Sequence, residues 1–216
     1  MLHRMSRRAA LGALVIAAAT GGTAWALSAD DQALVAKAVA YLDGLASVKA
    51  RFSQTDQRGD VATGVLYLAR PGRARFQYNP PSNLLITSDG KTVTLTDGRL
   101  KTQQRFPLRA TPLAVFLADH IRLDRGARVT RVDRAQGAFS ITARDDHALT
   151  QGEITLYFTE RPLRLTGWVV IDAQAQMTRV ILDDLTTIPE PPADLFVQAP
   201  AKGPAQTPSA AAGGQM

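Results

Sequence analysis

The chain has no cysteine. This absence excludes a disulfide-stapled scaffold and a thiolate metal site, and it leaves no cysteine of the chain's own for lipid attachment. Aromatic residues make up only 6% of the sequence, and there are three histidines. The enzyme motifs G-x-S-x-G and H-E-x-x-H are also absent. We therefore expect no catalytic residue, no metal and no cofactor.

The sequence also lacks clustered basic charge, although its formal net charge is +6. Arg4, Arg7 and Arg8 lie near the N-terminus, with no acidic residue among the first 26 residues. The other arginines are dispersed, and aromatic residues do not alternate with basic runs as they do in a nucleic-acid stacking groove. The pattern argues against a nucleic-acid-binding protein.

Residues 1–26 are typical of an export signal. The basic segment precedes an apolar run over residues 9–19, and Ala24-Trp25-Ala26 matches the A-x-A cleavage pattern. The run is short and rich in Ala, Gly and Thr, which disfavours an anchor across a bilayer about 30 Å thick. Ser6-Arg7-Arg8 partly resembles a twin-arginine signal, so the general and the twin-arginine export routes both stay open.

Residues 27–199 have the length of one domain, and residues 200–216 lack the apolar side chains for a core, so we expect a disordered tail there. Short apolar runs and alternating runs with frequent turn residues predict an antiparallel meander. We expect strands over residues 48–57, 61–70, 73–78, 84–88, 91–96, 128–134, 138–143, 152–159, 163–171 and 177–185, with a last short edge at 195–197.

Two helices are predicted beside these strands. Residues 30–47 carry apolar side chains at three- and four-residue spacing, and Asp30 suits the N-cap. The second helix begins at Thr111 and Pro112, a capping residue followed by a residue that fits the first helical turn. Residues 103–110, which precede it, are polar and are expected to form a loop. The second helix is therefore interpreted as a rim element, either a lid or a plain core plug.

A sheet of about eleven antiparallel strands twists and curls. Two short helices cannot cover both of its faces, and several strands carry apolar residues on both sides. The curled sheet therefore has an inner face that is either an apolar cavity under helical lids or a barrel interior packed with side chains.

The hairpin of residues 64–81 reads GVLYLARPGRARFQYNPP. Pro71 and Gly72 suit its tight turn. Arg70 ends the apolar first strand, and a guanidinium beside an apolar surface is costly unless it finds carbonyl or carboxylate acceptors.

This hairpin resembles the LolA family of periplasmic outer-membrane lipoprotein carriers. Further resemblances are Phe52-Ser53-Gln54 on the first strand, the turn Ser88-Asp89-Gly90-Lys91, and Thr111-Pro112-Leu113 at the middle helix. The resemblance extends over residues 31–196. It implies a mostly β fold with some α: an unclosed, strongly curved antiparallel β-barrel with a helical lid over an apolar cavity.

The resemblance also implies a function. Members of the family take triacylated lipoproteins from an ATP-driven inner-membrane release complex and pass them to an outer-membrane receptor. We accordingly expect a monomeric, non-enzymatic carrier in the periplasm of a Gram-negative cell, whose cargo is bound through its acyl chains. Where no separate receptor exists, residues 80–85 are a weak candidate for a loop that inserts cargo into the membrane.

Arg70 matches the family arginine that hydrogen-bonds lid backbone in the closed state, and the resemblance implies a lid switch there. The alternative is a rim arginine paired with a nearby acid. Candidate cavity residues, by alternation and bulk, are Phe52, Leu66, Leu68, Phe76, Leu113, Phe116, Leu117, Phe158 and Trp168. After Lys91, where many members carry aromatic residues, this chain has Thr92-Val93-Thr94-Leu95.

The sequence leaves three other functions open. Asp145-Asp146-His147 could hold a metal or act as a base, but the segment is more typical of a solvated turn. A lipid sensor that regulates a membrane partner could share the open barrel, although such sensors tend to carry a second domain. Carriage of another lipid, such as a glycolipid, would place the same demands on the cavity.

Overall fold

The computed structural model describes residues 27–111, 114, 117–120, 127–145, 152–172 and 174–198. Within these ranges the chain forms one α-helix, α1 (Ala29–Asp43), two short 3₁₀ helices, η1 (Leu108–Ala110) and η2 (Ala193–Phe196), and eleven strands. The strands are β1 (Ser47–Thr55), β2 (Val61–Ala69), β3 (Arg73–Tyr78), β4 (Leu84–Asp89), β5 (Thr92–Asp97), β6 (Thr102–Pro107), β7 (Ala127–Ala135), β8 (Ala138–Asp145), β9 (Glu153–Glu160), β10 (Leu163–Ile171) and β11 (Met177–Thr187).

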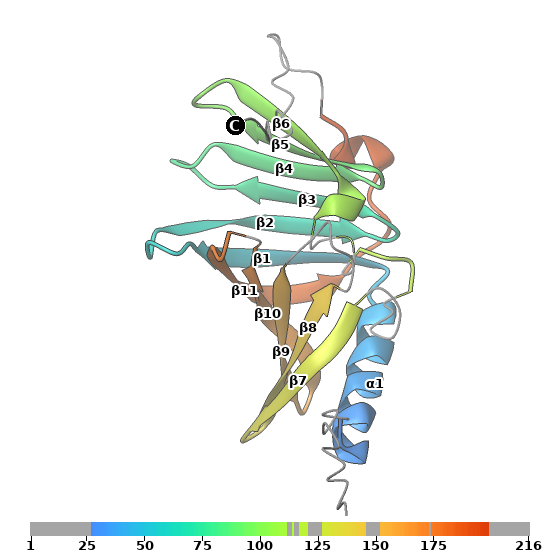
Figure 1. Cartoon of the computed structure of the whole chain (residues 1–216). Coiled ribbons are helices and arrows are strands. Elements are labelled where there is room, and N and C mark those ends of the chain that lie inside the picture. Colours follow the sequence, from blue (N-terminus) through green and yellow to red (C-terminus); the bar gives the residue numbers. More distant parts are fainter. Residues whose placement is uncertain are drawn as a thin grey trace, which may run out of the picture.

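All eleven strands belong to one sheet in the order β6-β5-β4-β3-β2-β1-β11-β10-β9-β8-β7. Every neighbouring pair is antiparallel, and β6 and β7 are the two edges. Strands β2 to β6 run across one half of the molecule, while β7 to β10 fan out steeply in the other half (Figure 1). The predicted unclosed, curved antiparallel sheet of about eleven strands is confirmed.

Alternating side chains give the sheet an apolar inner face. On β1, Val48, Ala50 and Phe52 are each 2% exposed, while Lys49 and Arg51 lie on the outer face. Phe52 pairs with Gly64 on β2. A Cβ at Gly64 would lie 2.7 Å from the Phe52 ring, so the glycine leaves the space that this ring fills.

Helix α1 covers the inner face of the β7–β10 half (Figure 1). Its Tyr41 ring meets Phe158 edge-on at 6.4 Å, and the backbone N–H of Leu165 donates to the Tyr41 hydroxyl at 3.3 Å. Leu42, on the same helix, is fully buried. The predicted helix exists, but Ser28 rather than Asp30 provides the N-cap, and the helix ends before Gly44.

Two predicted segments differ from the structure. Residues 103–110 were expected to be a loop, but β6 pairs with β5 from Thr102 to Pro107, and η1 follows it. Residues 195–197 were expected to form an edge strand, but they include the end of η2, in which Phe196 is buried. The export signal, most of the second helix at residues 111–117, and the tail from residue 200 lie outside the described residues.

Candidate functional site

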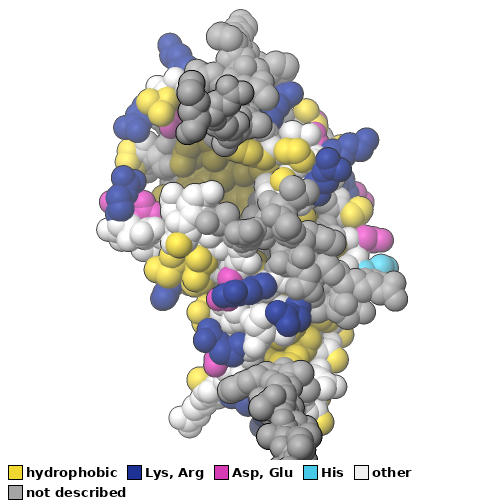
Figure 2. Space-filling model, viewed as in Figure 1, with side chains coloured by type: hydrophobic (Ala, Val, Ile, Leu, Met, Phe, Trp, Pro, Cys, Tyr) yellow, Lys and Arg dark blue, Asp and Glu magenta, His cyan; other side chains and the backbone are white. Residues whose placement is uncertain are grey.

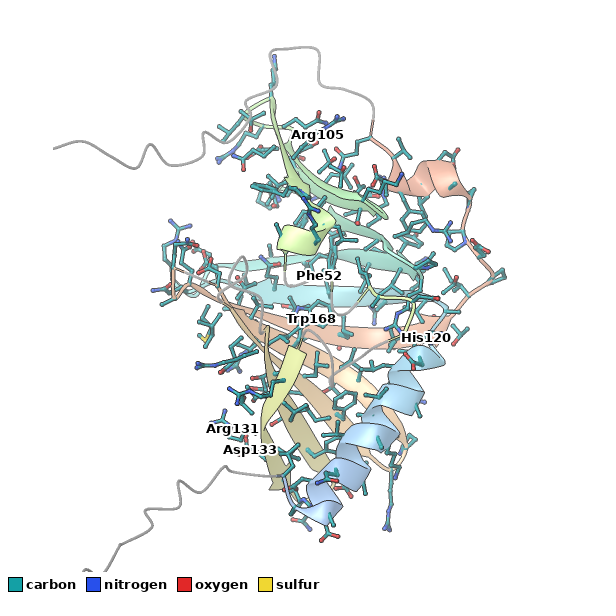
Figure 3. All side chains as sticks on the ribbon, turned by 45° about the vertical axis from the view of Figure 1, so that its right-hand side comes forward. Phe52, Arg105, His120, Arg131, Asp133 and Trp168 are labelled. Carbon is teal, nitrogen blue, oxygen red and sulfur yellow. The ribbon has the colours of Figure 1, made fainter. Side chains whose placement is uncertain are left out.

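Seven of the nine predicted cavity residues lie in one buried apolar cluster on the inner face of the sheet. They are Phe52, Leu66, Leu68, Phe76, Leu117, Phe158 and Trp168. The Phe76 ring contacts Phe52 at 5.6 Å and Trp168 at 6.3 Å, both edge-on, which links β3 to β1 and β10. Phe52 and Trp168 lie in the middle of the molecule, where the two halves of the sheet meet (Figure 3). Leu113 and Phe116 lie outside the described residues.

The inner face of the sheet is hollowed in the half of the molecule that contains β2 to β5. Figure 2 shows a hollow with a floor of hydrophobic side chains, over the region where Figure 1 draws β2 to β5. Apolar surface that is left open in this way is costly in water, at about 25 cal/mol per Å². A ligand with long hydrocarbon chains would remove that cost.

Arg70 lies where β2 ends, beside the C-terminal end of α1. Its Nη1 donates to the carbonyl oxygen of Leu42 at 2.6 Å and lies 3.8 Å from the Asp43 carboxylate. The Arg70 side chain is 4% exposed. Burial lowers the pKa of the guanidinium from its usual value, and the Asp43 charge opposes that shift. The arginine therefore joins the sheet to the last turn of the helix.

The turn that follows Arg70 also joins other motifs found in the sequence. The N–H of Gly72 donates to the carbonyl of Leu117 at 2.8 Å, and the Ser88 hydroxyl donates to the carbonyl of Gly72 at 2.6 Å. Gly72 has a φ of 75°, and a Cβ there would lie 2.5 Å from the Cα of Gly90. Three segments far apart in the sequence thus meet at one end of the hairpin.

The N-terminal end of α1 has its own connection to the sheet. Arg134, at the end of β7, donates to the Asp31 carboxylate at 2.8 Å. The Ser28 hydroxyl and Arg134 both lower the pKa of Asp31. The helix is thus bonded to the sheet at both ends. The sequence pointed to Arg70 but not to Arg134 or to either acceptor.

Two polar side chains on the inner face, Tyr78 and Gln54, form a hydrogen bond that the sequence did not predict. The Tyr78 hydroxyl donates to the side-chain oxygen of Gln54 at 2.6 Å. Gln54 belongs to the motif Phe52-Ser53-Gln54, and Tyr78 belongs to the hairpin motif, but neither motif predicts that the two side chains meet.

The histidines do not form a metal or catalytic cluster in the described part of the chain. There, no group of three His, Cys, Asp or Glu side chains could hold a metal ion. His120 is exposed, 3.9 Å from the neighbouring Asp119 carboxylate. Asp146 and His147 lie outside the described residues.

A family model described as "Outer membrane lipoprotein carrier protein LolA" matches residues 43–199. The chain belongs to the LolA family. It is 28% identical over 184 residues to an outer-membrane lipoprotein carrier protein of Pseudomonas paraeruginosa, an alignment that covers 80% of this chain and 86% of that protein. It is 31% identical over 107 residues to the protein of the same name in Chromobacterium violaceum. That second alignment covers 46% of this chain and 52% of its relative.

Among solved structures, a LolA superfamily protein from Nitrosomonas europaea matches with a TM-score of 0.44 and 9% identity, over 76% of this chain and 97% of that chain. LolA family carriers are not enzymes, which confirms the expectation of a non-enzymatic protein. No helix within the described residues is long and apolar enough to span a membrane.

Proposed function

We propose that this LolA family member carries lipoproteins through the periplasm by binding their acyl chains against the inner face of its sheet. The observation that carries the proposal is the apolar hollow in the β2–β5 half of the inner face, together with the Arg70–Leu42 hydrogen bond that holds α1 over the other half. In this proposal residues 1–26 direct export, residues 27–199 form the carrier domain, and residues 200–216 are a tail outside it.

The energetics of an acyl chain explain why a carrier is needed. Burial stabilises each CH₂ by about 0.8 kcal/mol, so a triacylated anchor does not cross water unaided. Delivery also requires release. If loading moves α1, it breaks the Arg70–Leu42 hydrogen bond, and this cost makes binding weaker than the buried area alone would give.

In this proposal α1 acts as a lid, and its opening and closing give the transfer a direction. Cargo would be accepted from an ATP-driven release complex in the inner membrane, which supplies the energy to open the lid. It would be passed to an outer-membrane receptor as the Arg70–Leu42 contact re-forms. The names of the relatives, outer-membrane lipoprotein carrier proteins, support this assignment of cargo and destination.

The test is a transfer assay with the mature protein as a monomer. Spheroplasts that make a labelled outer-membrane lipoprotein are mixed with wild type, with Arg70→Leu, and with Arg58→Leu as a matched control. Arg58 lies in the exposed turn after β1 and pairs with Asp56. Wild type and Arg58→Leu should release lipoprotein as a one-to-one complex and deliver it to outer membranes.

The variant Arg70→Leu should load cargo but retain it, with transfer slowed roughly tenfold or more, because one charge-assisted hydrogen bond no longer favours the closed state. Failure of wild type to release lipoprotein, while free lipid co-purifies with it, would replace the proposal by carriage of another lipid. Equal transfer by Arg70→Leu would remove the switch role alone.

A further inference from the structure

The apolar inner face of β1 and β3 ends in a polar pair. Gln54 follows Phe52 by two residues on β1, and Tyr78 follows Phe76 by two residues on β3, so all four side chains point to the inner face. The Tyr78 hydroxyl donates to the Gln54 side-chain oxygen at 2.6 Å across β2. The small residues Ala62 and Gly64, opposite Gln54 and Tyr78, leave the space for this bond.

The pair is firmly held from the tyrosine side. Tyr78 is 6% exposed, and its ring packs edge-on against Phe52 at 5.0 Å. Burial raises the pKa of Tyr78 to about 12, so the phenol stays protonated and remains a donor to the amide oxygen. A bond that fixes the oxygen of an amide also fixes the direction of its NH₂ group.

Among the residues that the structure describes, that NH₂ group has no acceptor, because the Gln54 side chain bonds to Tyr78 through its oxygen. Gln54 itself is half-buried, beside Val180 and Ala62. An uncharged N–H donor on an apolar wall suits an uncharged acceptor such as a carbonyl oxygen, since a buried ion would need an opposite charge.

The position of the pair along the strand fits the head of an acyl chain. The Arg70 end of the hairpin lies beside Ser47, which pairs with Ala69. Gln54 is seven residues further along β1, which corresponds to about 23 Å in an extended strand. Apolar side chains occupy the inner face between these two ends.

Beyond the pair the surface becomes more polar. A pocket of about 400 Å³ has a mixed lining: Ala62, the neighbour of Gln54, lies among apolar residues such as Leu84 and Pro80, and Asn79, Asp97 and Arg99 supply polar side chains. A ligand that lay along β1 would therefore pass from hydrocarbon surroundings, past one fixed amide donor, to a rim where polar side chains are available.

From this arrangement we infer that Gln54 binds a carbonyl oxygen of the ligand's acyl linkage, the ester or amide that joins each fatty chain to its polar head, with Tyr78 as the positioning residue. The inference rests on the proposed acyl-chain binding and deepens it, because it fixes which end of the chain lies at which end of the sheet. The polar head then lies in the pocket beside Asn79.

The test compares two synthetic lipopeptides with chains of equal length. One carries ester-linked acyl chains on a glyceryl-cysteine head, and the other carries the ether-linked analogue, which lacks the ester carbonyls. Dissociation constants are measured by displacement of a fluorescent fatty-acid probe from the mature protein. Wild type should bind the ester roughly two- to tenfold tighter than the ether, the effect of one neutral hydrogen bond.

The variant Gln54→Leu should bind both ligands equally, and Tyr78→Phe should show a reduced preference because the amide is no longer oriented. Gln57→Leu makes the same change at an exposed position in the next turn and should keep the wild-type preference. An ester preference that survives in Gln54→Leu, or is absent in wild type, overturns the inference and leaves the carrier proposal intact.

Failure of both lipopeptides to displace the probe from wild type would instead overturn the carrier proposal. A second measurement needs no variant: infrared spectra of the bound ester, labelled with ¹³C at its carbonyls. A hydrogen bond from Gln54 lowers the carbonyl stretching frequency relative to the same ester in an alkane. A band at the alkane position would overturn the inference.

Discussion

The two halves of the sheet are covered on opposite faces. In the β7–β10 half, helix α1 lies on the inner face, with Tyr41 against Phe158. In the β3–β5 half the inner face is hollowed (Figure 2), and the segment that packs against this half lies on the outer face. There the C-terminal segment, residues 188–198, crosses the outer face as a strap and buries Phe196.

Hydrogen bonds and an ion pair hold the strap on the outer face of the sheet. Arg73 pairs with Glu190 at 2.6 Å, and Arg75 donates to the carbonyl of Leu195 at 3.0 Å. The Gln198 side chain donates to Thr87 at 3.0 Å. The two halves therefore differ in how they are supported: the strap packs behind the strands that present the hollow, while α1 fills the inner face of the other half.

The largest expected effect is a difference in stability between the variants Phe158→Ala and Phe76→Ala. Phe158 stacks on Phe139 at 5.0 Å under the helix, whereas Phe76 lies on the inner face of β3, in the hollowed half. Phe158→Ala should lower the free energy of unfolding by about 3–5 kcal/mol, and Phe76→Ala by less, because Phe76 is 7% exposed and Phe158 only 1%. Denaturant titration measures both.

Binding of the fatty-acid probe should show the opposite order. Phe76→Ala should weaken it, because the variant removes apolar surface from the hollowed half, while Phe158→Ala should leave it nearly unchanged under conditions where the variant is folded. Equal effects of the two variants on binding would show that the halves do not divide the work in this way.

The next largest effect is expected from loss of the buried side chain in the strap. Phe196→Ala should cost about 3 kcal/mol of unfolding free energy, since Phe196 is 1% exposed. Hydrogen exchange should rise in β3 to β5 and stay unchanged in β8 to β10. Val197→Ala, at a residue 60% exposed, is the matched control and should change neither. A uniform rise over the whole sheet would contradict a strap that supports one half.

Sequence patterns predicted the elements whose side chains alternate or run apolar. Residues 163–171 were predicted as a strand, and β10 has the same bounds. Strand β6 was missed because Gln103, Gln104 and Arg105 give this edge strand no apolar face. Residues 195–197 resemble a strand by their apolar run, but only Phe196 is buried, and it anchors a 3₁₀ turn instead.

The candidate site was predictable in part for a similar reason. Bulk and alternation identified the apolar residues that gather on the inner face, such as Phe52 and Trp168. Arg70 stood out as a cation beside apolar residues, but its acceptor is the backbone carbonyl of Leu42, which no side-chain pattern encodes. The Gln54–Tyr78 bond depends on strand register across β2, which local sequence does not reveal.

A smaller effect is expected where α1 contacts the sheet. Tyr41→Phe removes the acceptor of the Leu165 N–H and should cost about 1 kcal/mol, seen as faster amide exchange in α1 and at Leu165 but not in β3 to β5. Tyr67→Phe, on the outer face under Lys49, is the control and should leave α1 unchanged. Unchanged exchange at Leu165 in Tyr41→Phe would show that this bond does not hold the helix.

The smallest effect concerns the pH dependence of the Asp31–Arg134 pair. The pKa of Asp31 in the folded protein is lowered from 3.8, so the folded state binds its proton less readily than the unfolded state does. The stabilisation is therefore fully present above that value and is lost as the pH falls through the lowered pKa. Because both side chains are partly open to water, the loss should loosen only the first turn of α1.

The measurement is an NMR titration of the Arg134 guanidinium. Its signals should stay constant from neutral pH down and change with a midpoint below 3.8, and Asp31→Asn should abolish that transition. Asp30→Asn, one residue earlier in the exposed first turn, should preserve it. A midpoint at or above 3.8 in wild type would mean that Arg134 does not hold the Asp31 carboxylate in solution. The polar contacts described between α1 and the sheet would then lie in its C-terminal half, at Tyr41 and Arg70.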